Sequence, residues 1–430
     1  MKEHLFKGIT KKDNELWFSD LQRKREPGPV LSARHYNTYG ESTKSVHAGQ
    51  YDDPVTGAIG TPVFQNTTFY LNTATYNAIE QGSVRDRFIY SRYGNPSQWA
   101  AQQKTATLEN AESAIVLSSG MAAISTVILA LAEKGCHIIT SRDVYGGSYN
   151  LLYEDLQKFG ISTSFVDMTD VDAVKKAITD KTKLLYFESL SNPLLKIAPI
   201  EDLVEITRQN GCRLIIDNTF LTPCNLKPLD FGVDVVVNSA TKYLGGHSDL
   251  IAGTISGSRK LMDQIWPQML KNGGSLDPHA CFLLERSLKT LAIRMQVHNK
   301  NALALAEFLE TQDNIIRVYY PGLPSHPQAS LAQKLFPGKY GGMVSFEMKG
   351  GNDAALRLLD NLALPKQATS LGGVESLISL PYNTSQASLT KKQRIALGIN
   401  DGLVRLSVGI EDIDDLIADF KQAFHNIYKK

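Results

Sequence analysis

From about residue 113 onward, short apolar runs rich in β-branched residues alternate with amphipathic segments. The apolar runs predict strands at residues 114–117, 137–140, 162–166, 183–187, 213–216 and 233–237. The amphipathic segments predict helices at 120–132, 171–178 and 200–209. This alternation predicts a mostly parallel sheet with helices on both faces, and such a sheet binds ligands at the carboxyl ends of its strands.

The chain on either side of this sheet has a different pattern. After residue 257 it predicts helices at 259–271 and 278–311, the second with one weak break, then strands at 315–320, 343–348 and 403–410, and a last helix at 412–428. We interpret this part as a second, α+β module. Residues 1 to about 45 have little periodicity, and we expect an extended arm that a larger body or a neighbouring subunit must order.

Composition narrows the class of protein. The 430 residues include 45 Lys and Arg against 44 Asp and Glu, a balance that argues against nucleic acid as the main partner. The sequence has no uninterrupted apolar stretch long enough for a transmembrane helix, and residues 1–20 lack the apolar core of a secretory signal. The four cysteines have no C-x-x-C spacing, so we expect neither a disulfide scaffold nor a zinc ribbon, and the cytoplasm is the expected compartment.

The familiar nucleotide-binding and hydrolase motifs are absent from the sequence. It contains no G-x-G dinucleotide fingerprint, no P-loop, no H-E-x-x-H zinc motif and no G-x-S-x-G nucleophile elbow. The nine histidines are scattered, which weakens the case for a catalytic metal. An α/β protein of this size must therefore carry its chemistry on other residues.

A lysine stands directly after the predicted strand at 233–237, in the run Asn238-Ser239-Ala240-Thr241-Lys242-Tyr243. An amine that emerges into a partly desolvated site has a lowered pKa and becomes a nucleophile. Ser239 and Thr241 could donate hydroxyl hydrogen bonds to a phosphate. A surface lysine at a strand-to-helix turn is the alternative that this run alone leaves open.

Three further features follow neighbouring strands. Asp217 ends the strand at 213–216 and could pair with a protonated ring nitrogen, although it could equally cap the next turn. Ser119 and Gly120 begin a helix, where free N–H groups bind a phosphate or are capped by the serine. Tyr145 lies in a tight turn after the strand at 137–140 and could stack on a ring. An amine, a ring-nitrogen partner, a phosphate site and a stacking ring are together what pyridoxal 5′-phosphate (PLP) requires.

Eight motifs follow one another from residue 45 toward the C-terminus. They are Ser45-Val46-His47-Ala48-Gly49, Tyr90-Ser91-Arg92-Tyr93-Gly94-Asn95-Pro96, Ser119-Gly120-Met121-Ala122-Ala123, Glu188-Ser189-Leu190-Ser191-Asn192-Pro193, Asp217-Asn218-Thr219-Phe220, Ser239-Ala240-Thr241-Lys242-Tyr243, Tyr320-Pro321-Gly322-Leu323 and Val404-Arg405-Leu406-Ser407-Val408-Gly409. In this order the motifs resemble those of the Cys/Met-metabolism family of PLP-dependent enzymes, which includes cystathionine γ-synthases, cystathionine γ-lyases, methionine γ-lyases and homoserine-ester sulfhydrylases.

The resemblance implies the aspartate aminotransferase-like fold, also called fold type I, with a mostly parallel sheet and a smaller C-terminal α+β domain. It implies an N-terminal arm and intersubunit segment at 1–91, a PLP-binding α/β domain at 92–287 and the C-terminal domain at 288–430. In this family the intersubunit segment reaches the site of the adjacent subunit. We therefore expect a homo-oligomer, a dimer at least and a tetramer by resemblance.

The resemblance also implies a role for each motif residue. Lys242 would hold PLP through its amine and later move protons, while Tyr145 would stack on the ring and act as the acid for a departing thiolate. The other PLP-binding residues would be Tyr90 and Arg92, both for the adjacent subunit, and Gly120, Met121, Asp217, Thr219, Ser239 and Thr241. The substrate-binding residues would be Arg405, which clamps the α-carboxylate, together with Asn192, Ser370 and Thr369.

The members of this family catalyse different reactions, and different residues of this sequence favour different members. Thr369 stands where many cystathionine enzymes carry a Glu that could attract a distal ammonium, so a neutral Thr favours an apolar tail such as that of methionine. Gly146 and Gly147 after Tyr145 are typical of the cystathionine enzymes, since many methionine γ-lyases carry a Cys after the first Gly. Tyr93 occurs among some synthases, and residues 380–385 depart from the common family pattern.

We favour a PLP-dependent γ-lyase that releases 2-oxobutanoate, ammonia and a thiol from methionine or cystathionine. A γ-synthase or homoserine-ester sulfhydrylase is the first alternative, and a β-lyase is the second. A non-catalytic PLP-binding regulatory protein is a remote alternative, because Lys242, Asp217, Tyr145 and Arg405 are all present. Turnover of any amino acid would exclude it.

Overall fold

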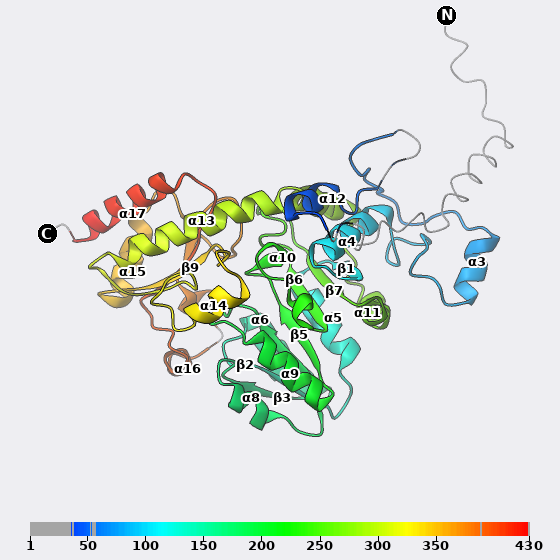
Figure 1. Ribbon diagram of the computed structural model, residues 1–430, viewed down its shortest axis with the longest axis horizontal. Coiled ribbons are helices and arrows are strands. Elements are labelled where there is room, and N and C mark those ends of the chain that lie inside the picture. The colour runs from blue at the N-terminus through cyan, green and yellow to red at the C-terminus, as the bar shows by residue number, and fades with distance from the viewer. Residues whose placement is uncertain (1–35, 37, 52, 54–56, 388, 429–430) are drawn as a thin grey trace, which may run out of the picture.

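Two β-sheets, each with its own hydrophobic core, organise the chain (Figure 1). The structure is a computed structural model that describes residues 36, 38–51, 53, 57–387 and 389–428. Most of the arm that the sequence predicts at residues 1–45 therefore lies outside the described residues.

The first sheet has seven strands in the order β1-β7-β6-β5-β4-β2-β3. Its strands are β1 (Ser113–Leu117), β2 (His137–Ser141), β3 (Ser162–Val166), β4 (Thr182–Glu188), β5 (Arg213–Asp217), β6 (Val235–Ser239) and β7 (Gly253–Gly257). The pairs among β2 to β6 are parallel, and only β7 runs antiparallel to its two neighbours, β1 and β6. The predicted mostly parallel sheet is thus confirmed, with β7 as a strand that the sequence pattern did not indicate.

Helices cover both faces of this sheet, as the alternating pattern predicts. On one face, α5 (Gly120–Leu131) and α11 (Arg259–Asn272) bury their apolar sides in one cluster of the core. On the other face, α4 (Pro96–Leu108), α9 (Ile200–Asn210) and α12 (Pro278–Leu288) contribute to a second cluster. The sheet is therefore buried on both sides, as expected for strands joined by helical crossovers.

The second sheet has five strands in the order β10-β11-β12-β9-β8 and is mostly antiparallel. Its strands are β8 (Ile315–Tyr319), β9 (Met343–Met348), β10 (Lys366–Gln367), β11 (Leu377–Ser379) and β12 (Leu403–Ser407). Its helices α15 (Gly351–Asn361) and α17 (Ile413–Tyr428) lie beside α13 (Leu291–Glu310) at one end of the molecule (Figure 1). The predicted strand at 403–410 ends at Ser407, opposite Met343, the first residue of its neighbour β9.

The helix α13 joins the two cores. Its first residues, such as Leu291 and Met295, belong to the core of the first sheet, whereas Leu305 and Leu309 belong to the core of the second. The predicted weak break in the helix at 278–311 is the gap between α12 and α13. The domain boundaries at 92 and 288 remain predictions.

The other helical segments are short. They are α2 (Glu41–His47), α3 (Thr73–Glu80), α6 (Gly146–Asn150), η2 (Leu151–Asp155), α7 (Leu156–Lys158), α8 (Val171–Ala177), α10 (Thr222–Asn225), η3 (Pro228–Phe231), α14 (Ala329–Leu335), η4 (Pro381–Asn383) and α16 (Lys391–Ala396). Helix α3 stands clear of the rest of the molecule (Figure 1), and Tyr76 on it is 57% exposed. Among the described helices, none combines the length and the apolar character needed to cross a membrane.

Candidate active site

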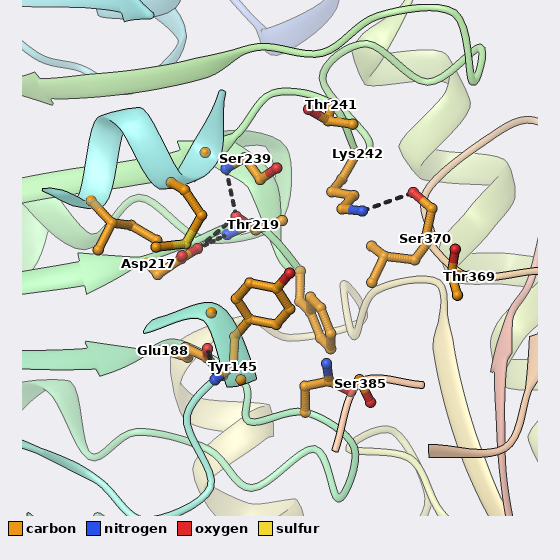
Figure 2. Close-up of a pocket in the computed structure, with 18 of the residues that line it drawn as sticks. Tyr145, Glu188, Asp217, Thr219, Ser239, Thr241, Lys242, Thr369, Ser370 and Ser385 are labelled. Carbon is orange, nitrogen blue, oxygen red and sulfur yellow. Dashed lines mark hydrogen bonds between the residues drawn. The ribbon is translucent and has the colours of Figure 1, made fainter. Parts of the chain in front are cut away.

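A cavity of about 590 Å³ opens where three parallel strands of the first sheet end and the loops of the second sheet approach them (Figure 2). Glu188 ends β4, Asp217 ends β5 and Ser239 ends β6, and all three side chains line the cavity. The ligand site is thus at the sheet edge where the fold class predicts it.

Most of the predicted site residues meet in this cavity. Those that line it are Gly120, Met121, Tyr145, Asn192, Asp217, Thr219, Ser239, Thr241, Lys242, Thr369, Ser370 and Arg405. Figure 2 shows Lys242 and Tyr145 directed into the space between the Asp217 side and the Ser370 side. Their location is a structural finding, and the individual roles remain predictions.

Lys242 stands on the turn that follows β6. Its Nζ donates a hydrogen bond to the Ser370 Oγ at 2.8 Å, and its backbone N–H and C=O are held by the Ser239 carbonyl and the Gly246 N–H. Burial, together with the positive charge of Arg405, lowers the pKa of Lys242 to about 8. The amine is therefore available in its neutral, nucleophilic form at far lower pH than an exposed lysine.

Asp217 presents a carboxylate that the protein already orients. Its oxygens accept hydrogen bonds from the Thr219 hydroxyl at 2.6 Å, the Thr219 N–H at 3.0 Å and the Tyr186 hydroxyl at 3.3 Å. Burial raises the pKa of Asp217, and these donors oppose that rise by stabilising the charged form. A positively charged ring nitrogen is the kind of ligand that such a carboxylate binds.

The N-terminus of α5 lies against the end of β6 and the start of β7 because two positions carry no side chain. A Cβ on Gly120 would lie 2.7 Å from the Cβ of Ser239, and a Cβ on Gly253 would lie 2.1 Å from the Ser119 carbonyl oxygen. Ser119 caps the helix by accepting the Ala122 N–H at 3.0 Å. Helix N–H groups and the hydroxyls of neighbouring lining residues thus converge at one end of the cavity, where an anion would be stabilised.

Tyr145 forms one wall of the cavity and is 45% exposed. Its backbone N–H donates to the Glu188 Oε1 at 2.8 Å. Glu188 was not among the predicted site residues, although it directly follows the predicted strand at 183–187, as Asp217 follows the strand at 213–216. That shared position was the signal that could have identified it.

Arg405, on β12, supplies a buried cation at the opposite end of the cavity. Its Nη1 donates to the Asn192 Oδ1 at 3.3 Å and its Nη2 to the Ser370 carbonyl oxygen at 3.0 Å. Burial lowers the pKa of Arg405 to about 10, which leaves the guanidinium charged at neutral pH. A carboxylate is the ligand that this planar donor group binds best.

The structure does not bring Tyr90 and Arg92 into this cavity. The Arg92 Nη1 donates to the Leu270 carbonyl oxygen of α11 at 3.0 Å, and its guanidinium carbon lies 5.0 Å from the centre of the Tyr93 ring. Tyr90 is 41% exposed. Their predicted service to an adjacent subunit remains a prediction.

Several uncharged residues that line the cavity were not predicted from the sequence. They are Ile124, Gly146, Gly147, Asn150, Leu190, Phe220, Ile251, Leu371, Thr384, Ser385 and Ala387. Thr384 and Ser385 lie in the segment at 380–385, whose sequence departs from the family pattern. This segment therefore forms part of the cavity wall. Leu190 and Phe220 lie inside family motifs, and Gly146 and Gly147 directly follow Tyr145. The remaining five, Ile124, Asn150, Ile251, Leu371 and Ala387, have no distinctive local pattern in the sequence.

These groups fit PLP. The amine of Lys242, the carboxylate of Asp217 and the ring of Tyr145 face one cavity (Figure 2). The space between Gly120 and Ser239, at the start of α5, would be filled by any side chain larger than that of glycine. Across the described residues, no group of three or more His, Cys, Asp or Glu side chains is placed to hold a metal ion.

Comparison with known proteins agrees with a site for PLP. The profile of the family described as "Cys/Met metabolism PLP-dependent enzyme" matches residues 42–425. An L-methionine γ-lyase of Fusobacterium nucleatum subsp. polymorphum is 41% identical over 392 residues, which are 90% of this chain and 99% of that protein. A cystathionine β-lyase of Lactococcus lactis subsp. cremoris is 43% identical over 382 residues, 89% of this chain and 98% of that protein.

A solved structure of cystathionine γ-lyase from Lactobacillus plantarum, complexed with L-serine, superposes with a TM-score of 0.85. It is 38% identical in sequence, and the match covers 90% of this chain and 99% of that one. A cystathionine γ-synthase of Mycobacterium leprae is 40% identical. Relatives with different reactions therefore lie at nearly the same distance from this chain.

Proposed function

The chain belongs to the family of Cys/Met-metabolism PLP-dependent enzymes, and from that premise we propose that it is a carbon–sulfur lyase of sulfur amino-acid metabolism that catalyses γ-elimination. The substrate would be methionine or cystathionine. Methionine and water would give 2-oxobutanoate, ammonia and methanethiol, and cystathionine and water would give 2-oxobutanoate, ammonia and cysteine.

The observation that carries the choice of substrate is the distribution of charge in the cavity. Among the described residues that line it, the charged ones are Glu188, Asp217, Lys242 and Arg405. Asp217 and Lys242 suit the cofactor, Arg405 suits the substrate α-carboxylate, and Glu188 accepts a backbone N–H. None is left to bind the second amino-acid group of cystathionine, so the cavity favours an uncharged thioether tail and hence methionine.

Lys242, Asp217, Tyr145, Ser239 and Thr241 would hold PLP, with Gly120, Met121 and Thr219 beside them. When bound, PLP supplies an electron sink that makes protons next to the amino group of the substrate acidic.

The chain's own residues would then orient the substrate and move protons. Arg405 and Asn192 would fix the α-carboxylate, so that the Cα–H faces the amine of Lys242. Because burial lowers the pKa of Lys242 to about 8, its amine can accept and return a proton near neutral pH. The hydroxyl of Ser370, at 2.8 Å from Nζ, would hold the amine in the cavity, and the phenol of Tyr145 would protonate the departing thiolate.

We propose a homo-oligomer, a dimer at least and a tetramer by family resemblance, in which Tyr90 and Arg92 complete the site of the adjacent subunit. Their position outside this chain's own cavity supports that assignment. The cytoplasm is the compartment that we propose, because the four cysteines have no pairing pattern in the sequence.

The proposal is tested by incubating the purified holoenzyme separately with methionine, cystathionine, cysteine and a homoserine ester, and then quantifying 2-oxobutanoate, pyruvate and thiol. We expect 2-oxobutanoate and methanethiol from methionine. A thioether product from a homoserine ester plus cysteine, with little keto acid from methionine, would instead identify a γ-synthase. No turnover of any amino acid would support the non-catalytic alternative.

A further inference from the structure

We propose that Glu188 is a positioning residue. Its buried carboxylate fixes the position of the stacking ring of Tyr145 relative to the substrate-binding side chain of Asn192. The inference rests on the proposed function, since it assumes that Tyr145 contacts PLP and Asn192 helps bind the substrate. Glu188 itself acts through these two neighbours.

On the cofactor side, Glu188 fixes the backbone from which the Tyr145 ring projects. Its Oε1 accepts the Tyr145 N–H at 2.8 Å. Tyr145 precedes α6, a helix of only five residues, and its own side chain makes no capping hydrogen bond. Backbone N–H groups at the start of a helix have no partner within the helix, so the carboxylate is the acceptor that holds this N–H.

On the substrate side, the backbone N–H of Asn192 interacts with the same carboxylate and stabilises its charged form. The Asn192 carbonyl oxygen accepts a hydrogen bond from the Gln386 side chain at 2.8 Å, which fixes the backbone on its other side. The Oδ1 of Asn192 then lies 3.3 Å from the Arg405 Nη1. Glu188 thus acts on the residue whose side chain contacts the guanidinium that would bind the α-carboxylate.

A carboxylate suits this position better than an amide would. Glu188 is 7% exposed, and burial, with Asp217 directly opposite it on the neighbouring strand, raises its pKa. Holding an acid there is unfavourable by itself. The backbone N–H groups of Tyr145 and Asn192 nevertheless both favour the charged carboxylate. A glutamine would be uncharged, which weakens both interactions, and it would present its NH₂ group to one of the two N–H groups.

The test compares Glu188→Gln with Glu133→Gln, a matched change at an exposed position before β2. Three quantities are measured: the Kd of PLP for the apo-protein, followed by intrinsic fluorescence, and the KM and kcat for methionine. We expect Glu188→Gln to raise both Kd and KM by about 10-fold, the effect of losing one buried charge-assisted hydrogen bond, with kcat changed by less than about 3-fold. The control should leave all three unchanged.

A double-mutant cycle with Asn192→Ala separates positioning from general damage. If Glu188 acts on the substrate through Asn192, the KM of the double variant should equal that of Asn192→Ala alone, within about 2-fold. Fully additive effects, or a Glu188→Gln protein with wild-type Kd and KM, would overturn the inference. If Glu188→Gln does not fold, the same measurements on Glu188→Asp apply, for which a shorter carboxylate should raise both values and unchanged values would overturn it. A wild-type protein that neither binds PLP nor turns over amino acids would contradict the proposed function instead.

Discussion

The Nζ of Lys242 lies 2.8 Å from the Oγ of Ser370, although the two residues are 128 positions apart in the chain. Lys242 follows a strand of the first sheet, and Ser370 lies on a loop between two strands of the second. The amine therefore sits at the junction of the two structural units. Any ligand that reaches it is contacted from both sides, which links cofactor binding by one unit to substrate binding by the other.

Replacing Lys242 tests its role as the residue that holds the cofactor. The wild-type holoenzyme should show a band at ~420 nm that borohydride removes. Lys242→Ala should lose this band together with its activity, because no other amine lines the cavity in the described part of the chain. Lys260→Ala, at an exposed position on α11, should keep both. A Lys242→Ala protein with full turnover would contradict the assignment.

The pH dependence of Lys242 reactivity follows from its environment. Because only the neutral amine is nucleophilic, labelling of Lys242 in the apo-protein by an acylating reagent should rise with pH through a midpoint at about 8. In Arg405→Met a cation that lowers the pKa is removed, so the midpoint should move to higher pH. Peptide mass spectrometry measures this labelling, with the Lys260 peptide as an internal reference. A midpoint that does not move, or moves down, would show that Arg405 does not influence the amine.

Mixing inactive subunits tests whether active sites are shared. Arg92→Ala and Lys242→Ala pools should each be inactive, but after subunit exchange hybrid dimers contain one intact site. Random mixing should then restore about a quarter of the wild-type activity, since half of the dimers are hybrid and each has one of two sites intact. Native mass spectrometry verifies exchange. Verified exchange without recovery would mean that each chain builds its own site.

The residue at position 369 tests the preference for an uncharged tail. In Thr369→Glu, a carboxylate at the cavity wall should attract the distal ammonium of cystathionine and shift the ratio of kcat/KM toward cystathionine by roughly 5- to 150-fold. The methionine reaction should be unchanged or slower, because the new charge must be desolvated against an apolar tail. Thr369→Gln, which matches the size without the charge, should leave the ratio near the wild-type value. An unaltered ratio in a folded Thr369→Glu protein loaded with PLP would show that this position does not contact the tail.

The alternation of apolar runs and amphipathic segments was sufficient to predict most of the first sheet, because its central parallel strands β4, β5 and β6 are mostly buried and consist largely of apolar residues. It did not indicate β7, whose sequence Gly-Thr-Ile-Ser-Gly has a single large apolar residue. This strand is defined by its neighbours: it pairs with β1 and β6, and Gly253 permits contact with Ser119. Long-range packing of this kind leaves little trace in a local pattern.

The residues of the candidate site also divide into those that a local sequence pattern indicates and those that only long-range packing brings into the cavity. Lys242, Asp217 and Ser239 were predictable because each lies at the end of a strand whose position the local pattern gives. Ser370 and Thr369 came only from family resemblance, since their loop approaches the cavity through the packing of the second sheet on the first. Glu188 had the same local signal as Asp217 but lay in a motif in which only Asn192 was assigned a role.

The keto acid released from an equimolar mixture of methionine and cystathionine tests the central claim most directly. The thioether of cystathionine can be cleaved on either side of its sulfur, so the product identifies the bond that the enzyme breaks. Analysed by liquid chromatography and mass spectrometry, the products should contain 2-oxobutanoate as the main keto acid, with methanethiol in excess over cysteine. Pyruvate as the main keto acid, with homocysteine, would show β-elimination and contradict the proposed γ-lyase.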